Sequence, residues 1–124
     1  MLHHLNNPVY GVLIDSIVNS YLQTRGGYDV ARAPVVGIVA RSHCDFFRPA
    51  RYPGALLVGL RVVRVGARSV VYEVGVFMQG EGGVGDAACA VGGFTQIWVE
   101  RESNRVAEGG VPEWVRRCLR PLMK

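Results

Sequence analysis

Apolar residues recur at helical spacing near the start of the chain. The apolar positions are Val9, Val12, Leu13, Ile14, Ile17, Val18, Tyr21 and Leu22, and this spacing is typical of an amphipathic helix. Asn7 is a good N-cap and Pro8 a good first helical residue, whereas Gly26 and Gly27 are suited to the end of a helix. The pattern therefore predicts a helix over about residues 8–24. Because the apolar positions exceed one stripe, we expect this helix to be largely buried.

The rest of the chain follows strand patterns. β-Branched and aromatic residues gather in four segments, 35–47, 55–65, 69–79 and 89–102, which predict four strands. The short turn 66–68 joins the second and third strands as a hairpin, and glycine-rich residues 80–88 are expected to form a loop. The pair Gly92–Gly93 suggests a β-bulge, and Pro112 opens a short C-terminal helix. A long helix followed by hairpin-ordered strands predicts an α+β fold with the helix against an antiparallel sheet.

Length and composition narrow the class of protein. The 124 residues predict a single domain, residues 1–124. No apolar run reaches the roughly 18 residues that a membrane-spanning helix needs, and the N-terminus does not resemble a signal peptide. We therefore expect a soluble, cytoplasmic protein. So few strands leave sheet edges exposed, and pairing with a second subunit would cover such an edge.

Cysteine and histidine spacing argues against a metal site. The cysteines, Cys44, Cys89 and Cys118, are odd in number and form no CxxC pair, which favours a reducing compartment. They do not combine with the three histidines in any zinc-ligand spacing. Neither a metal nor a separate cofactor is therefore expected.

The basic residues leave two explanations open. The net charge is +4, and 13 of the 14 basic residues are arginine, Lys124 being the exception. A GC-rich genome would produce this bias without any function, but arginine also suits phosphate-bearing ligands because its planar fork pairs with two oxygens at once. The arginines are spread along the chain rather than gathered in one run, so no nucleic-acid partner is expected.

Several segments together resemble one family. HHLNNPVY (residues 3–10), followed by the apolar helix, resembles the G-H-V-N-N-x-V-Y motif of the hotdog-fold acyl-CoA thioesterases, the 4-hydroxybenzoyl-CoA thioesterase-like group. CDFFRPAR (44–51), GARS (66–69) and the segment 94–115 resemble later strands, a hairpin and the C-terminal exit of that family. The resemblance covers essentially the whole chain. It implies a curved antiparallel sheet around one long central helix, a homodimer or homotetramer with active sites between subunits, and thioester hydrolysis.

The resemblance also assigns roles at the start of the helix. In this family the thioester carbonyl lies against a backbone N–H at the helix N-terminus, where the helix dipole adds to its polarisation, and in this chain that amide belongs to Asn7. His4 falls on the motif histidine and is a candidate for positioning water or substrate, the alternative being a cap of the loop. His3 replaces the usual glycine, a departure that would narrow the loop.

One catalytic group of the family falls outside the sequence. Many members carry an aspartate just before the motif, and by this resemblance it would immediately precede Met1, with the family's first strand also upstream. Either the start has been placed too late or the chain shortened, or the protein lacks this carboxylate. The first explanation is favoured because the rest of the motif is intact.

Asp15 is the candidate carboxylate within the chain. In another branch of these thioesterases a carboxylate on the central helix, about two turns past the oxyanion amide, acts as nucleophile or general base. Asp15 lies eight residues after Asn7, about 80° around the helix and roughly 12 Å along it. It could therefore face an active site formed with a partner subunit, but not the oxyanion amide of its own helix. Alternatively, it bonds nearby backbone or pairs with an arginine such as Arg48.

Three further residues are candidates for substrate binding. Tyr10 is expected in the wall of an acyl pocket, and Gly11 would let substrate or another backbone approach closely. Ser69 follows a turn and either caps the strand or contacts the pantetheine arm. Cys44 and His43 should point to opposite faces of a strand, which argues against a nucleophilic Cys–His pair.

The combined hypothesis is an enzyme that hydrolyses an acyl thioester to a free acid and coenzyme A. Coenzyme A is then part of the substrate rather than a cofactor. The alternative is a non-catalytic subunit that binds acyl thioesters. The acyl group, the choice between a coenzyme A and a carrier-protein substrate, and the choice between dimer and tetramer are left open by the sequence.

Overall fold

The structure is a computed structural model that describes residues 7–47, 55–80, 83–84 and 88–123. Side chains are described for residues 14–47, 57–78 and 88–123. His4 and Arg48, which were singled out from the sequence, lie outside the described residues.

A long helix opens the described chain. Helix α1 spans Asn7–Gly26, one residue earlier and two later than expected. The residue after it, Gly27, adopts a positive φ of 67° and donates its N–H to the Gln23 carbonyl. Such a left-handed residue favours glycine because it has no Cβ, and the predicted C-terminal signal is confirmed.

Five strands form one antiparallel sheet. The strands are β1 (Val35–Phe46), β2 (Ala55–Val65), β3 (Ser69–Gly80), β4 (Gly83–Val84) and β5 (Ala90–Glu100). The order across the sheet is β1-β5-β3-β2, with the short β4 paired to β3. The four long strands and the β2–β3 hairpin match the prediction, whereas the expected loop over 80–88 contains β4.

The predicted bulge is in the wrong place. Gly92 and Gly93 pair without interruption with both neighbouring strands, and the irregularities lie instead at Ala40 in β1 and Val63 in β2. A Cβ on Gly93 would lie 2.0 Å from the Tyr72 carbonyl oxygen. Glycine at this position therefore permits a close approach of two strands rather than a bulge.

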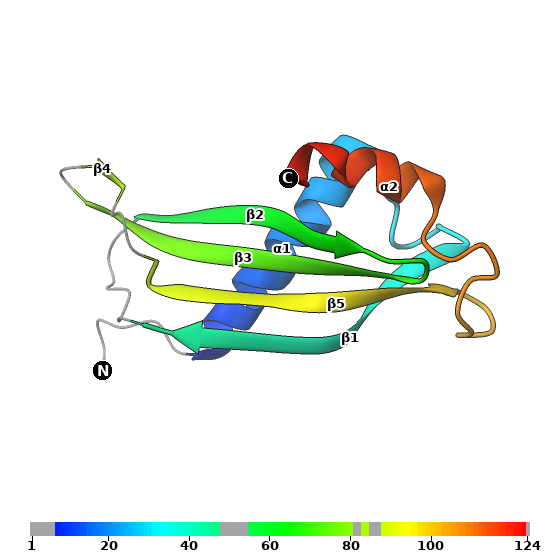
Figure 1. Ribbon diagram of the computed structural model, residues 1–124, viewed down its shortest axis with the longest axis horizontal. Coiled ribbons are helices and arrows are strands. Elements are labelled where there is room, and N and C mark those ends of the chain that lie inside the picture. The colour runs from blue at the N-terminus through cyan, green and yellow to red at the C-terminus, as the bar shows by residue number, and fades with distance from the viewer. Residues whose placement is uncertain (1–6, 48–54, 81–82, 85–87, 124) are drawn as a thin grey trace.

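Helix α1 crosses one face of the sheet, here called the inner face (Figure 1). Ile14, Val18 and Leu22, spaced four residues apart, are buried in a core that includes Tyr72 and Phe94 of the sheet. Other side chains of the helix, including Asp15 and Arg25, are exposed. The prediction of a largely buried helix is therefore wrong for the described side chains, because the sheet covers only one side of it.

The C-terminal end of α1 packs against a second helix. Helix α2 (Glu113–Leu119) follows Pro112, as predicted, and continues into the short 3₁₀ helix η1 (Arg120–Leu122). The Tyr21 hydroxyl donates to the Cys118 carbonyl at 2.8 Å. Figure 1 shows α2 lying across the end of α1, beside β2.

Strand β1 forms one edge of the sheet. It pairs with β5 on one side and with no strand of the described chain on the other. Most of its residues are exposed, including Ile38 at 46% and Val39 at 48%, whereas most residues of its hydrogen-bonded neighbour β5 are buried. No helix among the described residues is long and apolar enough to cross a membrane.

Candidate active site

A cavity lies where α1 meets the inner side of β1 and β5. Its volume is about 300 Å³, and it is lined by Ile14, Asp15, Val39, Ser42, His43, Cys44, Gly93 and Phe94. Two of these residues come from the third turn of α1 and the others from the two strands. The lining is mostly apolar, with one carboxylate, which is the composition expected of a small-molecule site.

Asp15 is the charged helix residue at this cavity. Its side chain is exposed, and within the described part of the chain its carboxylate forms no ion pair. The Asn19 amide donates to the Asp15 backbone carbonyl at 3.0 Å and not to its carboxylate. The carboxylate is thus available to a ligand or a water molecule in the cavity, and the alternative pairing with Arg48 falls outside the described residues.

A glycine in β5 lets the helix sit close to the sheet beside this cavity. Ile14 is buried next to Gly92, and a Cβ on Gly92 would lie 2.7 Å from Ile14 Cδ1 and 2.7 Å from the His43 carbonyl oxygen. Contacts this short are not tolerated without movement of the neighbours. The absence of a side chain at Gly92 therefore allows Ile14 of α1 to pack closely against β5 beside the cavity.

The bulge at Ala40 decides which β1 side chains face the cavity. Beyond it, Ser42 pairs with Phe94 and Cys44 with Gly92, both inner-face positions, while His43 pairs with Gly93 on the opposite face. Since neighbouring strand residues alternate, the expected separation of His43 and Cys44 is confirmed by the register.

Cys44 is poorly suited to nucleophilic attack. Burial, with a smaller contribution from Asp45, raises the pKa of the Cys44 thiol. The thiolate is the reactive form of cysteine, so the protonated thiol acts as an apolar wall. It packs against the buried residues Val76, Cys89 and Ala90.

Among the other predicted residues, Ser69 is the one with a described side chain, and it does not line this cavity. Asn7 is the first residue of α1, and Tyr10 and Gly11 lie in its first turns, but their side chains lie outside the described set. Ser69 is the first residue of β3, four register positions from Glu73, which lies opposite Gly93. This places it roughly 13 Å along the sheet from the cavity. Its backbone carbonyl accepts the Gly66 N–H at 2.8 Å, which closes the β2–β3 turn.

Three cavity residues were not predicted from the sequence. Val39, Ser42 and Phe94 read as ordinary strand positions, and which face each one takes depends on the bulge at Ala40. The alternation of side chains along β1 could have placed Val39 and Ser42 at the cavity only if the position of the bulge had been known. No group of three or more potential metal ligands occurs among the described residues.

The fold and cavity can now be compared with known proteins. The sequence model of the thioesterase superfamily, 4HBT, matches residues 2–84. The chain belongs to the thioesterase superfamily. Its fold is accordingly the hotdog fold, as the resemblance implied. No curated protein matches the chain.

Solved structures also resemble this chain over most of its length. The PA5185 protein from Pseudomonas aeruginosa strain PAO1 is 40% identical with a TM-score of 0.88, over 98% of this chain and 81% of that one. A thioesterase from Thermus thermophilus, solved with coenzyme A and zinc, is 28% identical with a TM-score of 0.72, over 98% of this chain and 82% of that one. The PA2801 protein from Pseudomonas aeruginosa shares the fold, with 23% identity and a TM-score of 0.81 over 93% of this chain and 84% of that one.

Proposed function

We propose that this thioesterase-superfamily protein hydrolyses an acyl-CoA thioester to a free acid and coenzyme A. Superfamily membership supports thioester hydrolysis in general. The observation that supports a site within this chain is the carboxylate of Asp15 at an otherwise mostly apolar cavity. The related Thermus thermophilus thioesterase was solved with coenzyme A, which supports a coenzyme A ester as the substrate.

The N-terminus of α1 is the proposed oxyanion site. A helix leaves its first backbone N–H groups without partners inside the helix, and the dipole of a 20-residue helix adds a partial positive charge there. The Asn7 amide is the proposed donor to the thioester oxygen. His4, Tyr10 and Gly11 would surround the same end of the helix as positioning and binding residues.

Asp15 and the Asn7 amide of one chain are too far apart to act on one carbonyl. Eight helical residues separate them by about 12 Å along the axis. We therefore propose that a second copy of the chain completes the site, as a homodimer or within a homotetramer. The exposed edge and apolar side chains of β1, beside the cavity, support pairing along this strand.

The proposed reaction balances without a cofactor. Asp15 removes a proton from water, and the hydroxide adds to the thioester carbonyl, whose negative oxygen is stabilised at the helix N-terminus. The carbon–sulfur bond then breaks, and coenzyme A leaves as a thiolate that takes up a proton. Direct attack by the Asp15 carboxylate, followed by hydrolysis of the anhydride, gives the same products.

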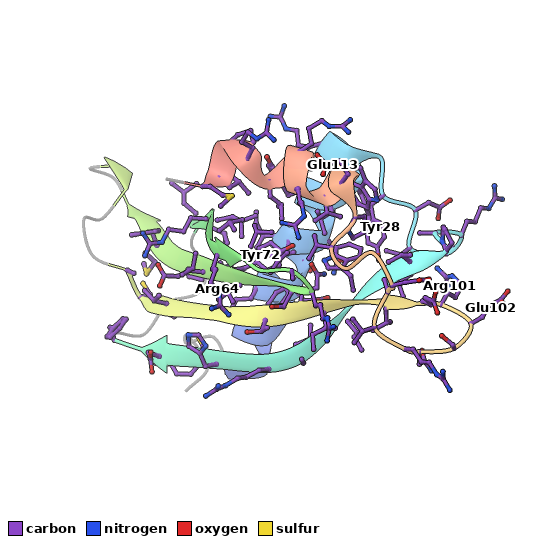
Figure 2. The ribbon with its side chains drawn as sticks, turned by 45° about the vertical axis from the view of Figure 1, so that its right-hand side comes forward. Tyr28, Arg64, Tyr72, Arg101, Glu102 and Glu113 are labelled. Carbon is purple, nitrogen blue, oxygen red and sulfur yellow. The ribbon has the colours of Figure 1, made fainter. Side chains whose placement is uncertain are left out.

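The test compares two carboxylates. Asp15→Asn keeps the shape of the side chain and removes its charge, whereas Glu102→Gln makes the same change at an exposed turn residue away from the cavity (Figure 2). With a panel of acyl-CoA and acyl-carrier-protein thioesters, thiol release should fall at least ~100-fold in Asp15→Asn and stay unchanged in Glu102→Gln.

Two results would contradict this proposal. Full activity in Asp15→Asn would remove Asp15 from the chemistry. Binding of acyl-CoA without hydrolysis by the unmodified chain would favour the alternative, a non-catalytic subunit that binds acyl thioesters. A preference for carrier-protein esters would change the substrate class while retaining the reaction.

A further inference from the structure

The outer face of the sheet, opposite α1, carries a second hollow. Figure 1 shows no described helix covering this face. The hollow has a volume of about 270 Å³ and is lined by Arg41, His43, Val71, Phe94 and Thr95. Neither Asp15 nor Ser69, the predicted site residues whose side chains are described, lines it.

Strand register brings the polar groups of this hollow together. Arg41 lies directly opposite Thr95, and Thr95 lies opposite Val71 on its other side. His43 follows two residues after Arg41 on the same face, opposite Gly93. Because Gly93 has no side chain, the space beside His43 stays open. A guanidinium, an imidazole and a hydroxyl therefore border one depression beside Val71.

The bulge at Ala40 is what turns these residues outward. Before it, Val39 pairs with the inner-face residue Gln96; after it, Arg41 pairs with the outer-face residue Thr95. Without the extra residue, Arg41 and His43 would face the helix. Bulges are known to redirect side chains in this way. The same irregularity thus supplies Ser42 to the inner cavity and two basic side chains to the outer hollow.

The charges around the hollow favour an anion. Neither Arg41 nor His43 forms an ion pair or side-chain hydrogen bond within the described part of the chain. Arg64 lies opposite Val71 in the same row of the sheet, and Figure 2 shows its side chain over the strands. Of the nearby acids, Glu73 is held by Arg61, with Nε and Nη2 each 2.6 Å from Oε1.

Asp45 is the remaining acid on this side. It follows His43 by two residues, opposite Val91, and does not line the hollow. Because Glu73 is paired with Arg61, the charged side chains that line the hollow are basic. They are Arg41 and His43, and Arg64 lies farther along the same row of cross-strand neighbours.

We propose that this hollow binds a phosphate monoester. The planar fork of Arg41 can donate two hydrogen bonds to phosphate oxygens, while His43 and the Thr95 hydroxyl offer further donors. Two sources share this chemistry, namely the 3′-phosphate of a nucleotide such as that of coenzyme A, and a phosphate group on its own. Val71 offers apolar contact to the rest of a larger ligand.

Calorimetric titration of the full chain tests this site without any turnover. The probes are inorganic phosphate, adenosine 3′,5′-bisphosphate and unphosphorylated adenosine. Arg41→Gln should weaken binding of the phosphorylated probes roughly tenfold or more, because a charge-assisted contact is lost. Thr95→Val, which keeps the side-chain shape, should weaken it less. Arg117→Gln removes the same charge from an exposed position on α2 and should change nothing.

The outcomes separate this proposal from the proposed function. Tighter binding of the bisphosphate than of inorganic phosphate assigns the site to a nucleotide, and equal binding assigns it to the phosphate alone. The proposal is overturned if the unmodified chain binds neither probe, or if Arg117→Gln weakens binding as much as Arg41→Gln. Hydrolysis is not measured here, so a failure of thioester hydrolysis leaves this result unaffected.

Discussion

The two parts of helix α1 lie in opposite surroundings. At the C-terminal end, Leu22 is fully buried, and a Cβ on Gly26 would lie 2.6 Å from Trp114 Cζ3. About two helical turns before Leu22, Asp15 is exposed beside a cavity and beside the edge of β1 that pairs with no other described strand. The first region is buried and closely packed, and the second borders a cavity of about 300 Å³.

The C-terminal end of α1 contributes packing that stabilises the fold, whereas the part beside the cavity carries the proposed catalytic group. Tyr28, Trp98 and Trp114 contact one another with ring centroids 5.4–5.8 Å apart, and they hold the C-terminal end of the helix in place. The part of the helix beside the cavity carries the exposed carboxylate of Asp15. Packing at the C-terminal end fixes the helix, so the Asp15 carboxylate beside the cavity is held on a rigid element.

The largest effect is expected from truncating the packed end. Trp98 is fully buried, so Trp98→Ala should lower the free energy of unfolding by about 3–5 kcal/mol. Urea unfolding measures this loss. Trp98→Phe keeps most of the bulk and should cost less, since among the described side chains Trp98 Nε1 is buried without a hydrogen-bond partner. Equal losses in the two variants would contradict a packing role.

A matched pair of glycines compares the two regions directly. Gly92→Ala places a Cβ 2.7 Å from a main-chain oxygen of β1 and 2.7 Å from Ile14, whereas Gly26→Ala meets only the side chains of Trp114 and Cys118. The main chain of β1 cannot move without disturbing its pairing with β5, so Gly92→Ala should destabilise by roughly 1–3 kcal/mol. Gly26→Ala should cost less, because alanine also favours the helix.

The same pair should differ in function. Gly92→Ala displaces Ile14 and β1 at the cavity and should alter the rate of thioester hydrolysis, while Gly26→Ala should leave the rate unchanged. Gly109→Ala is the control, because nothing lies within 4 Å of the Cβ it would add. Equal hydrolysis rates in all three variants would show that the cavity does not hold the substrate.

The sequence predicted the elements because their signals are local. Helical spacing, β-branched runs and the glycine and proline positions place α1, four long strands and α2 to within a few residues. The spacing of Asp15 from Asn7 likewise follows from helical geometry alone. What could not be predicted is which side chains of β1 face α1, because nothing in Val39–Ala40–Arg41 distinguishes a bulge from a regular strand.

The glycines of β5 show the same limit. Two adjacent glycines in a strand are compatible with a bulge or with close backbone approach, and the sequence favoured the first. The decisive facts are the Tyr72 carbonyl beside Gly93 and Ile14 beside Gly92, which come from residues about 20 and 80 positions away in the chain. Contacts of this kind appear only when the strands and helix are assembled.

A smaller effect than that of Trp98→Ala is expected at a buried polar pair of the sheet. The Tyr72 hydroxyl donates to Gln96 Oε1 at 2.7 Å, and both residues are buried. Tyr72→Phe leaves this oxygen without its donor and should cost about 1–3 kcal/mol at pH 7. Urea unfolding of both proteins at matched pH measures the difference.

Alkaline pH should shrink this difference. Burial, with smaller contributions from Cys118 and Tyr28, raises the pKa of Tyr72 well above its ordinary value. The folded state therefore holds the phenol proton more tightly than the unfolded state, so this stabilisation is complete below about pH 10 and declines as the pH rises above it. The slope difference between the unmodified chain and Tyr72→Phe should approach ~1.4 kcal/mol per pH unit above pH 10. Parallel pH profiles for the two proteins would show that folding does not raise the pKa of Tyr72.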